Sequence, residues 1–226
     1  MKVKRLQATG AAAFAGAVAI FVALAWGVEA RNTVVAADLH ATQWMVSHRS
    51  AVLTWLMVGV SALHSPGAMS VWAAGFGVVL LRRRERYWFL TLALAMGGGM
   101  LLNEGLKLLY RRARPVLVDP LVVLHSFSFP SGHTAGATLF YGVLAAYLVY
   151  FTRTPLQRVV LIAAAVAAVA LVGVSRIYLG AHYASDVLAA ACSSTVWLVM
   201  CLLGVHRLVQ RDGARPLGAG GDARAD

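Results

Sequence analysis

The chain has 226 residues, of which 60% are hydrophobic and only 13% are charged, and its mean hydropathy is +0.72. Soluble domains contain about a quarter charged residues, and disordered chains combine low hydrophobicity with high charge. The composition therefore excludes both classes and predicts an integral membrane protein built from helices. The net charge of +11 is expected from basic residues that flank membrane spans. No basic stripe with interleaved aromatic residues occurs, so we expect no nucleic-acid partner.

The N-terminal third of the chain predicts two spans separated by a helix in the membrane interface. The apolar segment Leu6 to Val28 follows three basic residues, and it exceeds the roughly 7–15 apolar residues of a cleavable signal, so we expect an uncleaved anchor. Residues 31–50 predict an amphipathic helix lying in the interface. Residues 51–63 are too short to cross a hydrocarbon core of about 30 Å. We therefore predict one span over residues 60–81, with 51–59 packed on its outer end.

Four further apolar segments complete an all-α bundle of six transmembrane helices, and they cover residues 87–109, 133–151, 156–174 and 186–206. Three consecutive glycines, 97–99, suit close helix packing in the third span. We treat residues 1–206 as a single membrane domain and expect the polar tail, 207–226, to be disordered. Cys192 and Cys201 lie nine residues apart, about 13 Å along a helix, which is too far for a disulfide.

Six spans place both termini on the same side of the membrane, and the charge distribution predicts that this side is the cytoplasm. With that orientation, thirteen of the 20 Lys and Arg residues lie in inner segments, in agreement with the positive-inside rule. The alternative is a separate span over residues 51–63, which inverts every later segment. It would place the basic block Arg82–Arg86 outside, so we disfavour it.

Two polar clusters lie where predicted spans three and four meet the outer face. Lys107, Arg111, Arg112 and Arg114 follow the third span, and Glu104 is placed to pair with Lys107. Arg111 and Arg112 have an equally good interpretation as surface residues that reach the lipid headgroups. The second cluster, Pro130-Ser131-Gly132-His133, opens the fourth span, and the free N–H groups of such a helix N-terminus attract phosphate.

A third cluster contains Arg176 at the end of the fifth span and His182 and Asp186 at the start of the sixth. His182 and Asp186 are four residues apart and share a helix face, where a carboxylate can orient an imidazole and raise its basicity. The alternative is an Asp that only complements the helix dipole. Helix parity brings all three clusters to one membrane face. Their cations, N–H donors and histidines suit a tetrahedral oxyanion, and we expect no metal because clustered carboxylates are lacking.

The spacing of these residues resembles the three-part signature of the type 2 phosphatidic acid phosphatase superfamily, which includes membrane lipid phosphatases and soluble vanadium haloperoxidases. The matching residues are Lys107 with Arg114-Pro115, then Pro130-Ser131-Gly132-His133, then Ser175-Arg176 with His182 and Asp186. The resemblance implies that His182 is a nucleophile that forms a phosphohistidine, that Asp186 holds it, and that His133 protonates the leaving group and then activates water. It also implies that no cofactor takes part and that the phosphoryl oxygens are bound by Lys107, Arg114, Ser131, Gly132 and Arg176.

These observations predict a metal-independent lipid phosphate phosphatase. Its candidate substrates are undecaprenyl pyrophosphate, phosphatidylglycerol phosphate and phosphatidic acid. The predicted location is a bacterial inner membrane, with the site facing the periplasm. The alternatives are a lipid phosphotransferase that uses the same site, a vanadate-dependent haloperoxidase, and a transporter or inactive lipid binder. The sequence leaves open the lipid, the preference for mono- or diphosphate, and the oligomeric state.

Overall fold

The computed structural model describes residues 2–30, 32–117, 121–122 and 124–211, and all regular structure within these ranges is helical. The described residues therefore confirm the all-α class. The helical elements, in chain order, are α1 Lys2–Glu29, α2 Thr33–Ser47, α3 Ala51–Leu63, α4 Pro66–Arg82, α5 Arg86–Ala93, the π-helical segment η1 Leu94–Gly98, α6 Gly99–Tyr110, α7 Gly132–Phe151, α8 Pro155–Tyr178 and α9 Ala184–Arg211.

Four helical stretches are long and apolar enough to cross a membrane, namely Arg86–Tyr110 (which joins α5, η1 and α6), α7, α8 and α9. Two further spans are counted only if each of two bent helix pairs crosses as one unit. These pairs are α1 with α2, bent by 89°, and α3 with α4, bent by 52°. The chain is thus a multi-pass membrane protein, and the count of six spans stays a prediction.

The span predicted over residues 60–81 is wrong at its beginning. Residues 60–63 form the last turn of α3, and α4 begins separately at Pro66. The Ser65 side chain accepts a hydrogen bond of 3.3 Å from the Ala68 N–H. A serine cap followed by proline at the first helical position starts a new helix, so the chain bends here.

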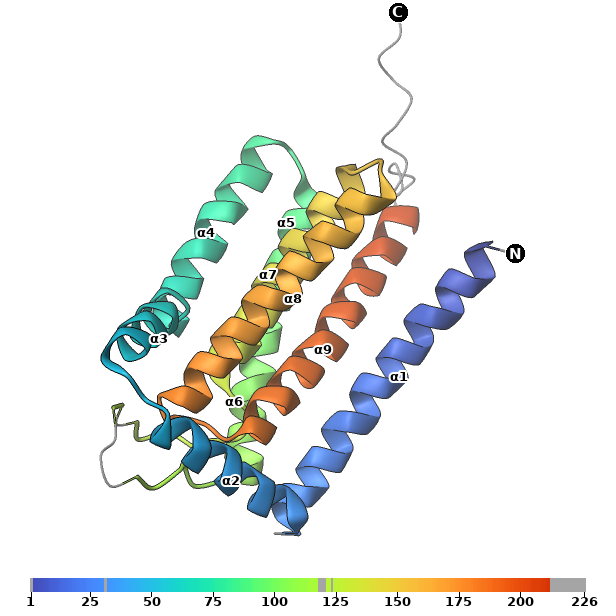
Figure 1. Cartoon of the computed structure of the whole chain (residues 1–226). Coiled ribbons are helices and arrows are strands. Elements are labelled where there is room, and N and C mark those ends of the chain that lie inside the picture. The colour runs from blue at the N-terminus through green and yellow to red at the C-terminus, as the bar shows by residue number, and fades with distance from the viewer. Residues whose placement is uncertain (1, 31, 118–120, 123, 212–226) are drawn as a thin grey trace, which may run out of the picture.

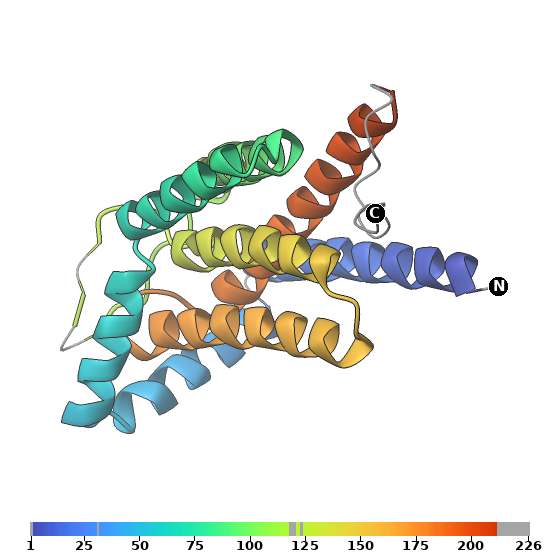
Figure 2. The same cartoon turned by 90° about the horizontal axis from the view of Figure 1, so that it is seen from above.

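The long helices run side by side, with α7 packed against α8 and α9, and α1 packed along α9 (Figure 1; from above in Figure 2). The main buried core lies where α4, α5, α7 and α9 meet, and it includes Leu80, Leu139 and Val143. This packing positions the beginnings of α7 and α9 and the end of α8 at the same end of the bundle.

Two of the three consecutive glycines allow the close packing predicted for them. A Cβ at Gly99 would lie 2.5 Å from Leu139 Cδ1 of α7, and one at Gly98 would lie 2.4 Å from Trp197 Cζ2 of α9. A Cβ at Gly97 would meet no atom within 4 Å. Gly98 and Gly99 therefore let the α5–η1–α6 span approach both neighbouring helices.

The helix predicted within residues 31–50 is confirmed as α2, which lies across the end of the bundle (Figure 1). Its expected amphipathic pattern is wrong, because the polar residues Asp38 and Thr42 are buried while Leu39 and Trp44 are exposed. The reason is that Asp38 finds polar partners at the start of α9. Leu39 and Trp44 are left on the outside, whereas Val34 and Met45 of the same helix pack against buried apolar clusters.

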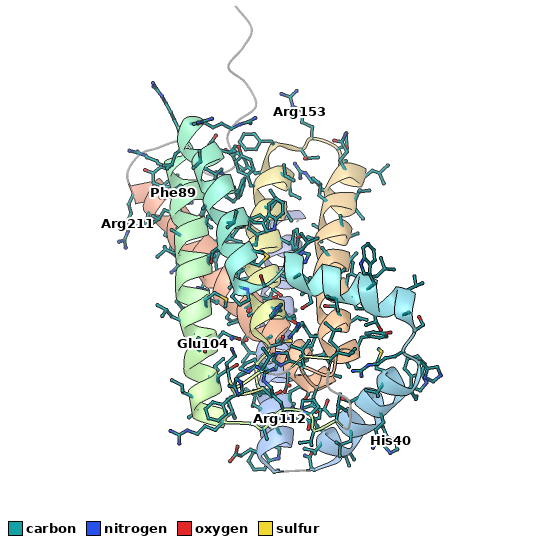
Figure 3. All side chains as sticks on the ribbon, turned by 90° about the vertical axis from the view of Figure 1, so that its left-hand side faces the viewer. His40, Phe89, Glu104, Arg112, Arg153 and Arg211 are labelled. Carbon is teal, nitrogen blue, oxygen red and sulfur yellow. The ribbon has the colours of Figure 1, made fainter. Side chains whose placement is uncertain are left out.

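The described chain begins and ends at the same end of the bundle, opposite α2 (Figure 1). Arg153 and Arg211 lie at that end, whereas Arg112 and His40 lie at the other (Figure 3). The last helix continues to Arg211, past the predicted boundary at residue 206. The rest of the predicted tail, residues 212–226, lies outside the described residues.

Candidate active site

Every residue predicted for the site lies at the end of the bundle that α2 covers. The charges of Arg176, His182, Lys107 and Arg114 all act on the half-buried His133 in the first turn of α7. These groups come from α6, the loop after it, α8 and the loop before α9. The three sequence clusters therefore form one site. The His133 imidazole makes no hydrogen bond within the described ranges and is free to bind a ligand.

The imidazole of His182 faces the carboxylate of Asp186, as predicted, but the predicted shared helix face is wrong, because His182 lies in the loop before α9 and only Asp186 is helical. His182 Nδ1 lies 3.5 Å from Asp186 Oδ2, which is longer than a normal hydrogen bond. His182 is only 1% exposed, and this burial lowers the pKa of His182 to about 4, aided by the positive charges of Arg114 and Arg176 and opposed by Asp186. The imidazole is thus a neutral base at neutral pH.

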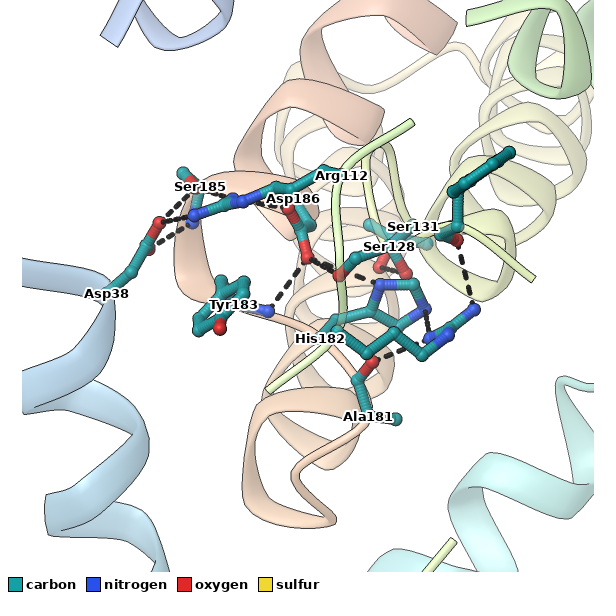
Figure 4. A network of polar contacts seen from close by, with 12 residues as sticks. Asp38, Arg112, Ser128, Ser131, Ala181, His182, Tyr183, Ser185 and Asp186 are labelled. Atoms are coloured by element: carbon teal, nitrogen blue, oxygen red, sulfur yellow. Dashed lines mark hydrogen bonds and ion pairs between the residues drawn. The ribbon is translucent and has the colours of Figure 1, made fainter. Parts of the chain in front are cut away.

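The two carboxylate oxygens of Asp186 accept hydrogen bonds from different donors. Oδ2 accepts hydrogen bonds from the Ser128 hydroxyl and, at 2.9 Å, from the Tyr183 N–H, and it is also the oxygen that faces His182 (Figure 4). Oδ1 accepts a hydrogen bond of 2.6 Å from Arg112 Nη1. The carboxylate is fully buried, so these charged and polar donors keep it ionised and oriented.

Arg114 covers the nitrogen of His182 that points away from Asp186. Its Nη1 lies 3.2 Å from His182 Nε2 and donates a hydrogen bond of 2.6 Å to the Ala181 carbonyl, while Nε donates to the Ser126 carbonyl at 2.7 Å. Burial lowers the pKa of Arg114, against the opposite effect of Asp186, but a guanidinium stays cationic at neutral pH. A permanent cation therefore lies at hydrogen-bond distance from His182 Nε2.

The beginning of α7 is fixed to the beginning of α9. The Ser131 N–H donates a hydrogen bond of 3.1 Å to the Asp186 carbonyl, and the Thr134 hydroxyl lies 3.1 Å from the Ser131 hydroxyl, to which it donates. A Cβ at Gly132 would lie 3.3 Å from Lys107 Nζ, so glycine lets the ammonium approach the helix start. The first N–H groups of a helix have no partners within the helix and can bind an anion.

Several buried donors have no partner in the part of the chain that the structure describes. Arg176 is 2% exposed and donates one hydrogen bond to Ser61 of α3, while its Nε and Nη2 are unpaired. Asn103, one turn before Lys107, has an unpaired amide nitrogen, which is a donor, and an unpaired amide oxygen, which is an acceptor. Lys107 itself forms the predicted ion pair with Glu104, at 2.7 Å. Unpaired buried donors are costly without a ligand, and a phosphate would pair them.

The loop that carries His182 depends on a glycine. Gly180 has a φ of +72°, in the left-handed region, and a Cβ there would lie 2.2 Å from Leu117 Cδ1. Glycine adopts this conformation without steric cost. The sharp turn from α8 brings His182 back toward the start of α9.

Three contributors to this site are missed by the sequence interpretation, namely Arg112, Asp38 and Ser128. The structure decides between the two interpretations of Arg112, because its side chain is 9% exposed and bonds to Asp38 and Asp186. Arg111 is the surface residue, and it donates only to the Leu108 carbonyl. The available signal for Asp38 is its position as the single acidic residue of α2, since a charge at membrane depth requires a partner. Ser128 carries no such signal.

No group of three or more His, Cys, Asp or Glu side chains within the described ranges is arranged to hold a metal ion. The two cysteines are both free. The absence of a cofactor stays a prediction.

Comparison with known proteins identifies the family. The family model described as "PAP2 superfamily" matches residues 87–210. The chain belongs to this superfamily. The matched region includes all three sequence clusters and therefore contains the candidate site.

A relative with a named activity agrees with the family. Phosphatidylglycerophosphatase B of Bacillus subtilis (strain 168) is 36% identical over 159 residues, which are 70% of this chain and 77% of the relative. This PAP2 member is therefore a lipid phosphatase, and thus a hydrolase.

Two crystal structures share the fold. The transmembrane PAP2-type phosphatidylglycerolphosphate phosphatase of Bacillus subtilis superimposes with a TM-score of 0.76 at 28% identity, over 89% of this chain and 98% of that one. LpxE of Aquifex aeolicus gives a TM-score of 0.59 at 24% identity, over 74% of this chain and 94% of that one. The second likeness shows the fold alone, and the first supports a membrane-embedded PAP2 fold.

Proposed function

We propose that this PAP2 lipid phosphatase hydrolyses a phosphomonoester or pyrophosphate of a membrane lipid through a phosphohistidine on His182, without a metal ion. The observation that carries this proposal is the state of His182. Its Nδ1 faces Asp186, its Nε2 faces the cation Arg114, and burial keeps the imidazole neutral at physiological pH. Nε2 is therefore a nucleophile aimed at the position where an anion would bind.

In the first step, His182 Nε2 attacks phosphorus, and the bond from phosphorus to the leaving oxygen breaks. His133, which takes up a proton when the phosphate anion binds beside it, donates that proton to the leaving oxygen, and the leaving group departs as an alcohol or a phosphate. Asp186 balances the positive charge that develops on the His182 ring. Lys107, Arg114 and Arg176 neutralise the charge on the phosphoryl oxygens, and Ser131 and the Gly132 N–H stabilise it by hydrogen bonds.

In the second step, water attacks the phosphorus of the phosphohistidine. His133, now neutral, accepts a proton from this water, the P–N bond breaks, and inorganic phosphate leaves. His182 returns to its neutral form and His133 to its protonated form. The cycle is closed, and no further reactant is required.

A site that apolar helices surround at one end of the bundle favours substrates that carry their own membrane anchor. Phosphatidylglycerol phosphate is the first candidate, supported by the name of the Bacillus subtilis relative. Undecaprenyl pyrophosphate and phosphatidic acid have the same kind of headgroup. We place the site at the outer, periplasmic face of a bacterial inner membrane, which the basic residues at the opposite end of the bundle support (Figure 3).

The test is a phosphate-release assay with these three lipids on the purified protein in detergent, with EDTA present and no acceptor added. We expect release from at least one lipid. His182→Ala should lower the rate by at least about 10³-fold, because the covalent step is lost. His40→Ala is the matched control, because His40 lies exposed on α2 and should leave the rate unchanged.

Each contrary outcome has a definite meaning. Loss of all activity in EDTA would overturn the metal-free mechanism. Phosphate transfer that requires an added lipid or sugar acceptor would identify a phosphotransferase. Lipid binding with no turnover, unaffected by His182→Ala, would identify a binding protein with an inactive site.

A further inference from the structure

Arg112 lies between two buried carboxylates that belong to distant helices. Its Nη2 is 2.7 Å from Asp38 Oδ2 of α2, and its Nη1 is 2.6 Å from Asp186 Oδ1 of α9 (Figure 4). The two aspartates are 3% and 0% exposed. One guanidinium therefore neutralises part of the charge of both.

Other contacts fasten the same three residues. The Ser185 N–H donates a hydrogen bond of 2.9 Å to Asp38 Oδ1, and Arg112 Nη1 donates one of 2.7 Å to the Ser185 hydroxyl. The guanidinium carbon also lies 4.2 Å from the centre of the Tyr183 ring, at a distance typical of a cation–π contact. α2 is thereby attached to the first turn of α9, where Asp186 lies.

This arrangement sets the rotation of the Asp186 carboxylate. Arg112 occupies Oδ1, so Oδ2 is the oxygen left to face His182 Nδ1. If the carboxylate turned about its Cβ–Cγ bond, Oδ1 would no longer face Arg112 and Oδ2 would no longer face His182. Asp38 pairs with Arg112 Nη2. That nitrogen is therefore unavailable to bind the second oxygen of Asp186.

Lysine cannot replace this arginine. A guanidinium presents several donors in a rigid plane, whereas an ammonium is a compact point charge. Bonding to Asp38 and Asp186 through two different nitrogens requires the planar fork. Loss of Arg112 would also leave two buried carboxylates without their cation, which is strongly unfavourable.

We propose that Arg112 and Asp38 are positioning residues for catalysis, which hold the Asp186 carboxylate in the rotation that orients His182 for attack. Neither residue is among the proposed phosphate ligands, and both act through Asp186. The proposal rests on the function proposed above for His182. It makes α2 part of the catalytic apparatus, not merely a cover over the site.

The test compares kcat with KM for phosphate release from phosphatidic acid vesicles by the full chain. Arg112→Gln should lower kcat roughly 10- to 100-fold, as loss of an outer-shell partner does in other sites, and should change KM by less than about 2-fold, since the phosphate ligands are intact. Arg112→Lys should not restore kcat. Arg111→Gln is the matched control, because the neighbouring arginine is exposed, and its kcat should equal that of the wild type.

Asp38→Asn tests the second carboxylate while keeping size and hydrogen-bonding capacity. It should lower kcat by about 3- to 10-fold, and adding it to Arg112→Gln should lower kcat by less than about 2-fold further, because residues that act as one unit are not additive. Should Arg112→Gln fail to fold by thermal unfolding, the Asp38→Asn result decides, and wild-type kcat in that variant overturns the proposal.

The remaining outcomes are equally decisive. An Arg112→Gln loss that appears only in KM, or fully additive effects of the two substitutions, overturns the positioning role. Trapping of acid-labile, alkali-stable phosphate on the protein tests the phosphohistidine mechanism separately from the positioning role. A wild type that releases phosphate without ever carrying it on histidine contradicts the proposed mechanism, whereas the kcat comparison of Arg112→Gln with Arg111→Gln still decides the positioning role.

Discussion

At the scale of single residues, the proposed chemistry depends on a histidine that remains unprotonated. Burial lowers the pKa of His182 to about 4 and outweighs the neighbouring Asp186, which acts in the opposite direction. The ordinary pKa of histidine is about 6.5. The folded protein therefore keeps a free base where an exposed histidine would be partly protonated.

We predict that His182 stays neutral down to about pH 5. The unfolded chain binds a proton at this residue below about pH 6.5, and the folded chain does so only near pH 4, so the stability that neutral His182 contributes is complete above about pH 6.5 and is lost as the pH falls through about 4. Nitrogen-15 NMR of histidine-labelled protein, assigned with His182→Asn, measures the titration. A midpoint near pH 6.5 would contradict the burial argument.

At the scale of helices, the position of Lys107 depends on how closely the α5–η1–α6 span packs. Gly99 lies two turns before Lys107 and against Leu139 of α7, whereas Gly97 faces open space. A side chain at residue 99 would push this span away from α7. The ammonium of Lys107 would then move away from the helix start at Gly132.

We predict opposite effects from two neighbouring substitutions. Gly99→Ala should destabilise the protein by about 1–3 kcal/mol, as overpacking does, and should also lower activity. Gly97→Ala should leave stability unchanged or raise it by up to about 1 kcal/mol, because alanine is the better helix former. Thermal unfolding in detergent, followed by tryptophan fluorescence, measures both. Equal effects from the two substitutions would show that the contact with Leu139 is unimportant.

At the scale of the whole molecule, the candidate site lies at one end of the bundle, and two flanking arginines that take no part in it lie at the other. The residues of the site lie at the α2 end, while Arg153 and Arg211 lie at the other (Figure 3). The positive-inside rule then predicts that the site faces away from the cytoplasm.

Thiol labelling in intact cells tests this orientation, in a protein whose Cys192 and Cys201 are replaced by alanine. Val116→Cys, at a position 95% exposed at the site end, should react with a membrane-impermeant maleimide. Arg153→Cys, at the opposite end, should react only after the cells are broken. The reverse pattern would invert the proposed topology.

The sequence predicts local features of this protein better than long-range partnerships. Glu104 and Lys107 are three residues apart on α6, so their pairing follows from helix geometry. His182, in the loop before α9, is close enough in the sequence to reach Asp186 in the first turn of that helix. Asp38 and Arg112 have no such relation, and only the folded bundle brings them together.

The errors in the predicted fold have local causes. Hydropathy alone extends the predicted span back to residue 60, whereas the serine and proline at residues 65–66 start a new helix. The predicted polarity of α2 is wrong because the pattern of a surface helix assumes that polar side chains face water. Asp38 faces a buried arginine instead.

The contact between α1 and α9 affects how the protein should be produced. Ala25 and Val28 of α1 share a buried apolar cluster with Ala189 of α9 and with Phe129, the residue next to the Pro130-Ser131 turn. A secretory leader removed by signal peptidase cannot substitute for this segment, because the cut would uncover Phe129 and leave one side of α9 without support. Expression vectors should retain the native N-terminal helix and carry the purification handle at the C-terminus, since α9 ends far from the reacting groups.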